Sequence, residues 1–154
     1  MKTRDLALTA IIAALYVAIT LVLAPISFGM FQFRISEMLN VLMKYNKRYI
    51  IAMIIGVAIA NLNSPIGIID VFFGVVCAIV MGLVYQLVKN SYLATIINGI
   101  AVGILIGIML HQFYGAPLIL SMISVGVTQI ITLFIGIVVF RELEKHEGLK
   151  NLLN

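Results

Sequence analysis

Charged side chains are scarce in this sequence. Lys, Arg, Asp and Glu make up 10% of the 154 residues, whereas about 25% is usual in a soluble domain. Apolar residues make up 63%, and the mean hydropathy over the whole chain is +1.18. This composition excludes an ordinary soluble domain and predicts an all-α polytopic membrane protein.

Cysteine is almost absent as well. Cys77 is the only one, so the chain has no internal disulfide and no cysteine-based metal cluster. No second histidine or acid stands at ligand spacing from His111, so we expect neither a metal site nor a cofactor. The ten basic residues are scattered rather than gathered on one face, so nucleic acid is not an expected partner.

Apolar runs separated by short polar turns predict six transmembrane helices, because one crossing takes about 20 residues. The predicted helices are Leu6–Ala24, Ile35–Lys44, Tyr49–Leu62, Ile66–Val88, Tyr92–Leu110 and Leu118–Phe140. The segments Pro25–Arg34 and His111–Pro117 are predicted outer loops. No internal repeat or linker interrupts the chain, so we expect a single integral-membrane domain over residues 1–154.

Basic residues indicate how the helices are oriented. Nine of the ten fall on one side of the six-helix arrangement, and the positive-inside rule makes that side cytoplasmic. We therefore expect both termini in the cytoplasm. The nine are Lys2, Arg4, Lys44, Lys47, Arg48, Lys89, Arg141, Lys145 and Lys150.

Arg34, Glu37 and Asp70 are the charged residues that lie away from the cytoplasmic ends. A charge deep in a bilayer costs about 2.5 kcal/mol or more, so such residues usually face a protein interior or an aqueous cavity. The spacing of Arg34 and Glu37 permits a salt bridge on one helical face, and Asp70 lies at the same outer depth. Two acids against one base leave one negative charge, which predicts a neutral or cationic nitrogen heterocycle as ligand. Which acid meets the ligand is open; if Arg34 pairs with Glu37, Asp70 remains for it.

Polar side chains gather at the same outer level. Amides offer a donor and an acceptor together, which suits the edge of a planar heterocycle. The alternatives are that Arg34 and Glu37 only pair with each other, and that Asn61 and Asn63 only cap and turn a helix. The predicted substrate-binding residues are Arg34, Glu37, Asp70, Asn40, Asn61, Asn63, Gln32 and Phe33, with Phe31, Phe33 or Phe72 as candidates for stacking on the ring.

Small residues recur every four positions in two predicted helices, and such stripes let another helix come close. The two stripes are Ala10, Ala14 and Ala18, and Gly99, Gly103 and Gly107. For the glycines we expect packing within this chain. For the alanines, internal packing and contact with another subunit are both open. Interhelical hydrogen bonding and ligand binding are likewise both open for Asn98 and Gln129.

Four blocks of the sequence, Ile26–Gly29, Gln32–Glu37, Gly56–Asn63 and Gly67–Gly74, carry a family likeness. With them the chain resembles the QueT-type family of queuosine-precursor transporters, which are similar to the substrate-binding S components of energy-coupling factor (ECF) transporters. The resemblance covers essentially the whole chain. It implies a six-helix protein of the bacterial plasma membrane that captures its ligand from outside and passes it inward with a separate energising module.

The resemblance also implies partners. These are a transmembrane coupling subunit, contacted by Ala10, Ala14 and Ala18, and ABC-type ATPases. The chain itself has no G-x-x-x-x-G-K-[ST] phosphate loop, so power must come from a partner or from a gradient. The implied substrate is a 7-deazaguanine, for which the aminomethyl form is our prediction.

Other functions are weighed against this one. A self-sufficient secondary transporter would use the same acids for proton coupling, but the sequence shows neither inverted repeats nor paired broken helices. An S component for another vitamin or nucleobase is not excluded by any residue. An enzyme is not expected, because no nucleophile stands with a base and no metal cluster is present in the sequence.

Overall fold

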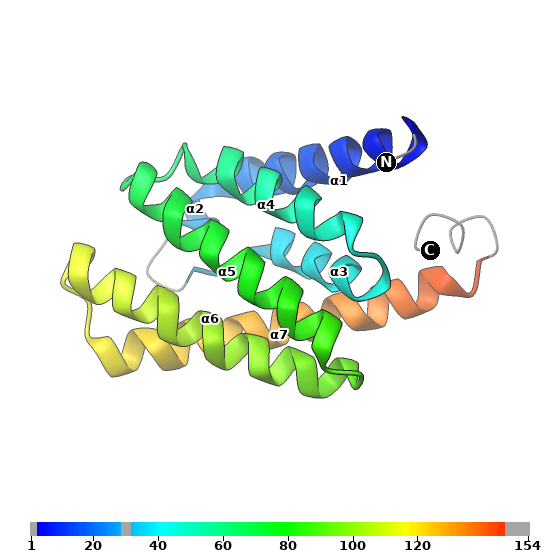
Figure 1. The fold of residues 1–154 in the computed structure, drawn as a ribbon. Coiled ribbons are helices and arrows are strands. Elements are labelled where there is room, and N and C mark those ends of the chain that lie inside the picture. Colours follow the sequence, from blue (N-terminus) through cyan, green and yellow to red (C-terminus); the bar gives the residue numbers. More distant parts are fainter. Residues whose placement is uncertain (1–2, 29–31, 147–154) are drawn as a thin grey trace.

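The computed structural model describes residues 3–28 and 32–146, and every regular element in these ranges is helical (Figure 1). Lys2, Phe31 and Lys150 lie outside the described residues. The all-α prediction is confirmed. The elements are α1 (Thr3–Val22), α2 (Ala24–Ser27), the 3-10 helix η1 (Ile35–Val41), α3 (Leu42–Tyr45), α4 (Arg48–Asn61), α5 (Ile68–Leu87), α6 (Ser91–Tyr114) and α7 (Leu118–Glu144).

Four of the described helices are long and apolar enough to cross a membrane. They are α1, α5, α6 and α7, with 20, 20, 24 and 27 residues. Helix α4 has 14 residues, about 21 Å at 1.5 Å per residue, which is short of the roughly 30 Å hydrocarbon core. The polytopic helical architecture is confirmed, whereas a count of six crossings stays a prediction.

Helices α6 and α7 form the most extensive contact between two elements. They approach closely because glycines line the contact. A Cβ atom added to Gly103 would lie 2.7 Å from the Met122 carbonyl oxygen and 2.9 Å from the Gly126 Cα, and real Cβ atoms need more room than this. The prediction that the glycine stripe packs within the chain is confirmed.

The short helix η1 lies at the centre of the bundle. It contacts α1, α4, α5 and α7, and α3 continues directly from its end (Figure 1). Its residues Ser36, Glu37, Leu39, Asn40 and Val41 are therefore buried. A Cβ atom on Gly136 of α7 would lie 2.5 Å from the Met38 carbonyl oxygen, so this glycine lets η1 approach α7.

The ends of the predicted helices need two corrections. The predicted loop Pro25–Arg34 begins inside the one-turn helix α2, where Pro25 occupies the first turn that favours proline. The predicted loop His111–Pro117 is helical as far as Tyr114. The helix ends at Gly115, which has a left-handed φ of 66° and caps it, while His111 Nδ1 lies 2.8 Å from the Ala116 carbonyl oxygen.

Candidate substrate site

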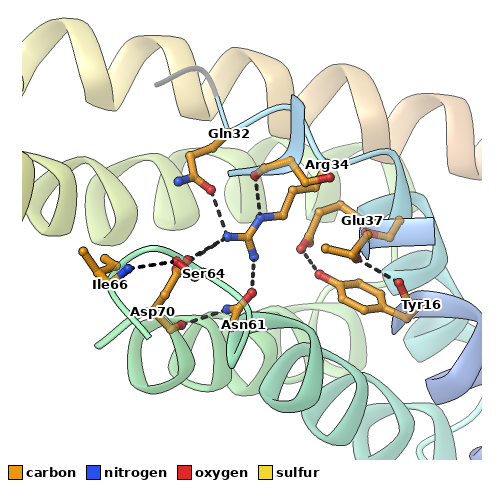
Figure 2. A network of polar contacts seen from close by, with 11 residues as sticks. Tyr16, Gln32, Arg34, Glu37, Asn61, Ser64, Ile66 and Asp70 are labelled. Atoms are coloured by element: carbon orange, nitrogen blue, oxygen red, sulfur yellow. Dashed lines mark hydrogen bonds and ion pairs between the residues drawn. The ribbon is translucent and has the colours of Figure 1, made fainter. Parts of the chain in front are cut away.

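A buried ion pair joins the residues that precede η1 to the first turn of α5. The Nη2 atom of Arg34 lies 3.3 Å from Oδ2 of Asp70, and the two side chains are 7% and 1% exposed (Figure 2). Burial by itself lowers the pKa of the Arg34 guanidinium, but the neighbouring groups together, with the negative charge of Asp70 first and smaller effects of Tyr16 and Glu37, hold the pKa above its ordinary value. Arg34 is therefore a fixed cation whose charge Asp70 balances.

The remaining donors of Arg34 are also engaged. Nη1 donates to Asn61 Oδ1 at 2.9 Å, Nη2 donates to Gln32 Oε1 at 2.9 Å, and Nε donates to the Ser27 carbonyl oxygen at 3.1 Å (Figure 2). The Phe28 ring lies 5.0 Å from the guanidinium carbon. One guanidinium therefore links the end of α2, the end of α4 and the start of α5, with few of its five N–H groups left for a ligand.

Glu37 belongs to a second group of contacts. The Tyr16 hydroxyl donates to its Oε1, and the Asn40 amide donates to its Oε2. Gln129 Nε2 of α7 donates to Oε2 at 3.1 Å. All three donors are neutral, and Glu37 is 8% exposed. A further hydrogen bond holds α1 to η1. It joins Thr20 Oγ1 to the hydroxyl of Ser36, the neighbour of Glu37, at 2.6 Å.

The salt bridge that the spacing of Arg34 and Glu37 permits does not form in the described part of the chain, because Arg34 pairs with Asp70 instead. The i,i+3 rule assumes that both residues lie in one helix. Arg34 has extended backbone angles, φ −101° and ψ 104°, and caps η1 from outside. Its side chain therefore points away from η1 to the start of α5, and Glu37 becomes the acid without an ion pair there.

A small pocket opens beside Glu37. Its volume is about 30 Å³, room for about two water molecules, so side chains must shift before a heterocycle can enter. The polar wall consists of Gln32, Arg34, Glu37 and Gln129. The apolar wall consists of Val57, Gly74, Cys77, Ala78, Met81, Val102, Ile106 and Val125 from α4 to α7.

The structure divides the predicted site residues into three groups. Gln32, Arg34 and Glu37 line the pocket. Three others are buried behind this wall: Asp70 and Asn61 contact Arg34, and Asn40 contacts Glu37. The remaining two, and one stacking candidate, are not part of the wall: Asn63 is exposed, Phe33 is partly buried, and Phe72 is 65% exposed.

Sequence reasoning did not assign two residues that the structure places here. For Gln129 the sequence allows both interhelical hydrogen bonding and ligand binding, and the structure gives it a hydrogen bond to Glu37 and a place in the pocket wall. An amide inside an apolar run was its signal. Tyr16 gave no signal, because an aromatic residue in an apolar run is ordinary in a membrane helix.

The alanine stripe lies on another face of α1. Ala10, Ala14 and Ala18 are exposed. They line an apolar groove of about 520 Å³, together with Ile55 and Ile59 of α4 and other residues of α1. Internal packing therefore does not account for this stripe in the described chain.

A family model described as QueT transporter matches residues 6–145. The queuosine precursor transporter QueT of Lactococcus lactis subsp. cremoris (strain MG1363) is 52% identical over 65 residues, which are 41% of this chain and 38% of that protein. The aligned stretch thus spans well under half of the relative. No solved structure matches the chain.

Proposed function

Because the chain belongs to the QueT transporter family, we propose that it is the membrane substrate-binding (S) subunit of an ECF-type importer. In this proposal it is one domain over residues 1–154 in the bacterial plasma membrane. It captures a queuosine precursor, a 7-deazaguanine such as the aminomethyl form, from outside. A transmembrane coupling subunit and ABC-type ATPases then drive delivery inward. Membership of a transporter family agrees with the expectation that the chain is not an enzyme.

The observation that carries the proposal is the pocket beside Glu37. It combines a polar wall of amide and charged groups with an apolar wall from four helices, which is the composition of small-molecule sites. A heterocycle can place its ring against the apolar wall and its N–H groups and acceptors against the polar wall. The pocket lies beside η1, at the junction of α4, α5, α6 and α7, so ligand binding there depends on the whole bundle.

The exposed alanine groove supports the partnership. Small side chains at Ala10, Ala14 and Ala18 let the backbone of another helix approach closely, and the isoleucines of α4 provide an apolar edge. The N-terminal end of α1 and the C-terminal end of α7 lie at the same end of the bundle (Figure 1). Because basic residues lie near that end, we propose that it faces the cytoplasm.

A secondary transporter is the second candidate, and one observation favours it. Glu37 is a buried carboxylate whose described partners are neutral, and buried acids of this kind serve proton-coupled carriers. The two candidates differ in their energy source. A carrier transports its substrate on its own when a proton gradient is applied, whereas an S subunit does so only with its ATPase module.

The test of the proposal is a thermal-shift screen of the purified protein. Queuosine precursors, thiamine, riboflavin, biotin and folates are compared, because a tight ligand stabilises by RT ln(1 + [L]/Kd). We expect the 7-deazaguanines to raise the unfolding temperature and the anionic folates to leave it unchanged. Uptake into proteoliposomes with and without the ATPase module and ATP then separates the two candidates. Uptake driven by a proton gradient alone contradicts the S-subunit role.

A further inference from the structure

The pocket wall carries one negative charge that the described chain leaves without an ion pair. Arg34 and Glu37 are its two charged residues. The charge of Arg34 is balanced by Asp70, with an Nη2–Oδ2 distance of 3.3 Å. The hydrogen-bond partners of Glu37 are a hydroxyl and two amides. A buried carboxylate without an ion pair is costly even when it is hydrogen-bonded, so a ligand that brings a positive charge is favoured there.

Glu37 also has capacity for one more donor. An ionised carboxylate offers about four lone-pair positions, and three are used by Tyr16, Asn40 and Gln129. Gln129 is the only one of these three partners that lines the pocket. A ligand can therefore donate to the free position, and it can also displace the Gln129 amide to gain a second.

Asp70 has no comparable access. It is 1% exposed and does not line the pocket. Its side chain accepts from Arg34, and its carbonyl oxygen accepts from Asn61 Nδ2 at 2.8 Å. A ligand could reach it only by displacing the guanidinium, which would leave a buried cation unpaired.

We infer, building on the proposed function, that Glu37 and not Asp70 binds the substrate and sets its specificity for a protonated nitrogen, with Gln129 as the adjacent polar contact. In a 7-deazaguanine that nitrogen is the ammonium of an aminomethyl group. Asp70 is a positioning residue that acts through Arg34. The site then rejects anions and prefers the cationic member of any pair of ligands with the same ring.

The test measures two probes by calorimetry on the purified protein. One is 7-aminomethyl-7-deazaguanine, and the other is the same ring with a neutral cyano group. We expect the parent to prefer the cationic probe by about tenfold or more, which is about 1.4 kcal/mol. Glu37→Gln should reduce this preference to less than about threefold and leave the neutral probe almost unaffected. Asp70→Asn should weaken both probes alike, and Glu142→Gln, an exposed matched change, should alter neither.

Each outcome decides between the two proposals. A parent that binds neither probe overturns the proposed substrate class. A parent that binds both without a preference, or Glu37→Gln with the preference intact, overturns the assignment of Glu37 alone. If Glu37→Gln does not fold, Gln129→Lys replaces it, because a lysine placed beside Glu37 supplies an internal ammonium. The affinity of that variant for the cationic probe should fall at least tenfold. Parent-like affinity for this probe would equally overturn the assignment.

Discussion

Replacing Asp70 with asparagine tests the buried ion pair that organises the site. The change removes one charge and keeps the shape, so the Arg34 guanidinium stays 7% exposed without its anion. Breaking a buried pair from one side costs about 3 to 5 kcal/mol. We expect the lower end, about 3 kcal/mol, because the asparagine carbonyl can still accept a hydrogen bond. For a chain of this size that loss lowers the unfolding temperature by roughly 6 to 12 °C.

The assay uses a property of the chain itself. Cys77 is the only cysteine and is buried, so a thiol-reactive fluorescent dye reports unfolding of the ligand-free protein in detergent. The matched control is Glu142→Gln, whose carboxylate pairs with Lys145 at an exposed site and should contribute less than about 1 kcal/mol. The double variant Arg34→Met with Asp70→Asn should be more stable than the sum of the single losses, because neither charge is then left unpaired. Asp70→Asn within 2 °C of the parent, or strictly additive losses, would refute the reasoning.

Three further predictions concern close packing, the partner surface and topology. Gly74→Ala should weaken ligand binding and lower stability, because the new Cβ would lie 2.3 Å from Asn61 Nδ2 and push away a residue that holds the Arg34 guanidinium. Titration and thermal unfolding measure both, and parent-like values would contradict this. Ala14→Leu should reduce co-purification with a coupling subunit while ligand affinity stays within about twofold, since the side chain fills a groove outside the pocket; equal loss of both would assign the stripe to internal packing. In a background without the native cysteine, Phe113→Cys should be labelled by an impermeant reagent from outside and Lys145→Cys only from inside, and the reverse pattern would invert the proposed topology.

The helical class could be predicted from the sequence because it follows from composition. The long helices could be predicted because apolar runs end at residues that favour turns. Helix α4 ends at Asn61, just before the Asn63, Ser64 and Pro65 cluster that predicts a turn. The predicted end of α6, at Leu110, is four residues early, because a polar residue such as His111 after an apolar run is typical of a loop. Its ring lies 2.8 Å from the Ala116 carbonyl oxygen, a contact that depends on the following turn and has no signature in the sequence.

The three charged residues of the candidate site could be picked out from the sequence, but their pairing could not. Arg34, Glu37 and Asp70 stood out because buried charge is costly anywhere in a membrane protein. Which acid meets Arg34 depends on where η1 begins and on the position of α5, and neither follows from spacing along the chain. The same limit applies to Asn63 and Phe33, which are near the site in sequence yet do not line the pocket.

The central claim is that the substrate occupies the pocket beside Glu37, and Cys77 tests it directly. This thiol lines the pocket, is 5% exposed and is the only cysteine in the sequence. Its modification by a small neutral thiol reagent is followed by mass spectrometry in lipid nanodiscs, with and without 7-aminomethyl-7-deazaguanine. The account predicts that the probe slows modification saturably, with half of the effect at the Kd measured by calorimetry. An unchanged rate at probe concentrations that saturate binding would contradict it, because the ligand would then lie elsewhere.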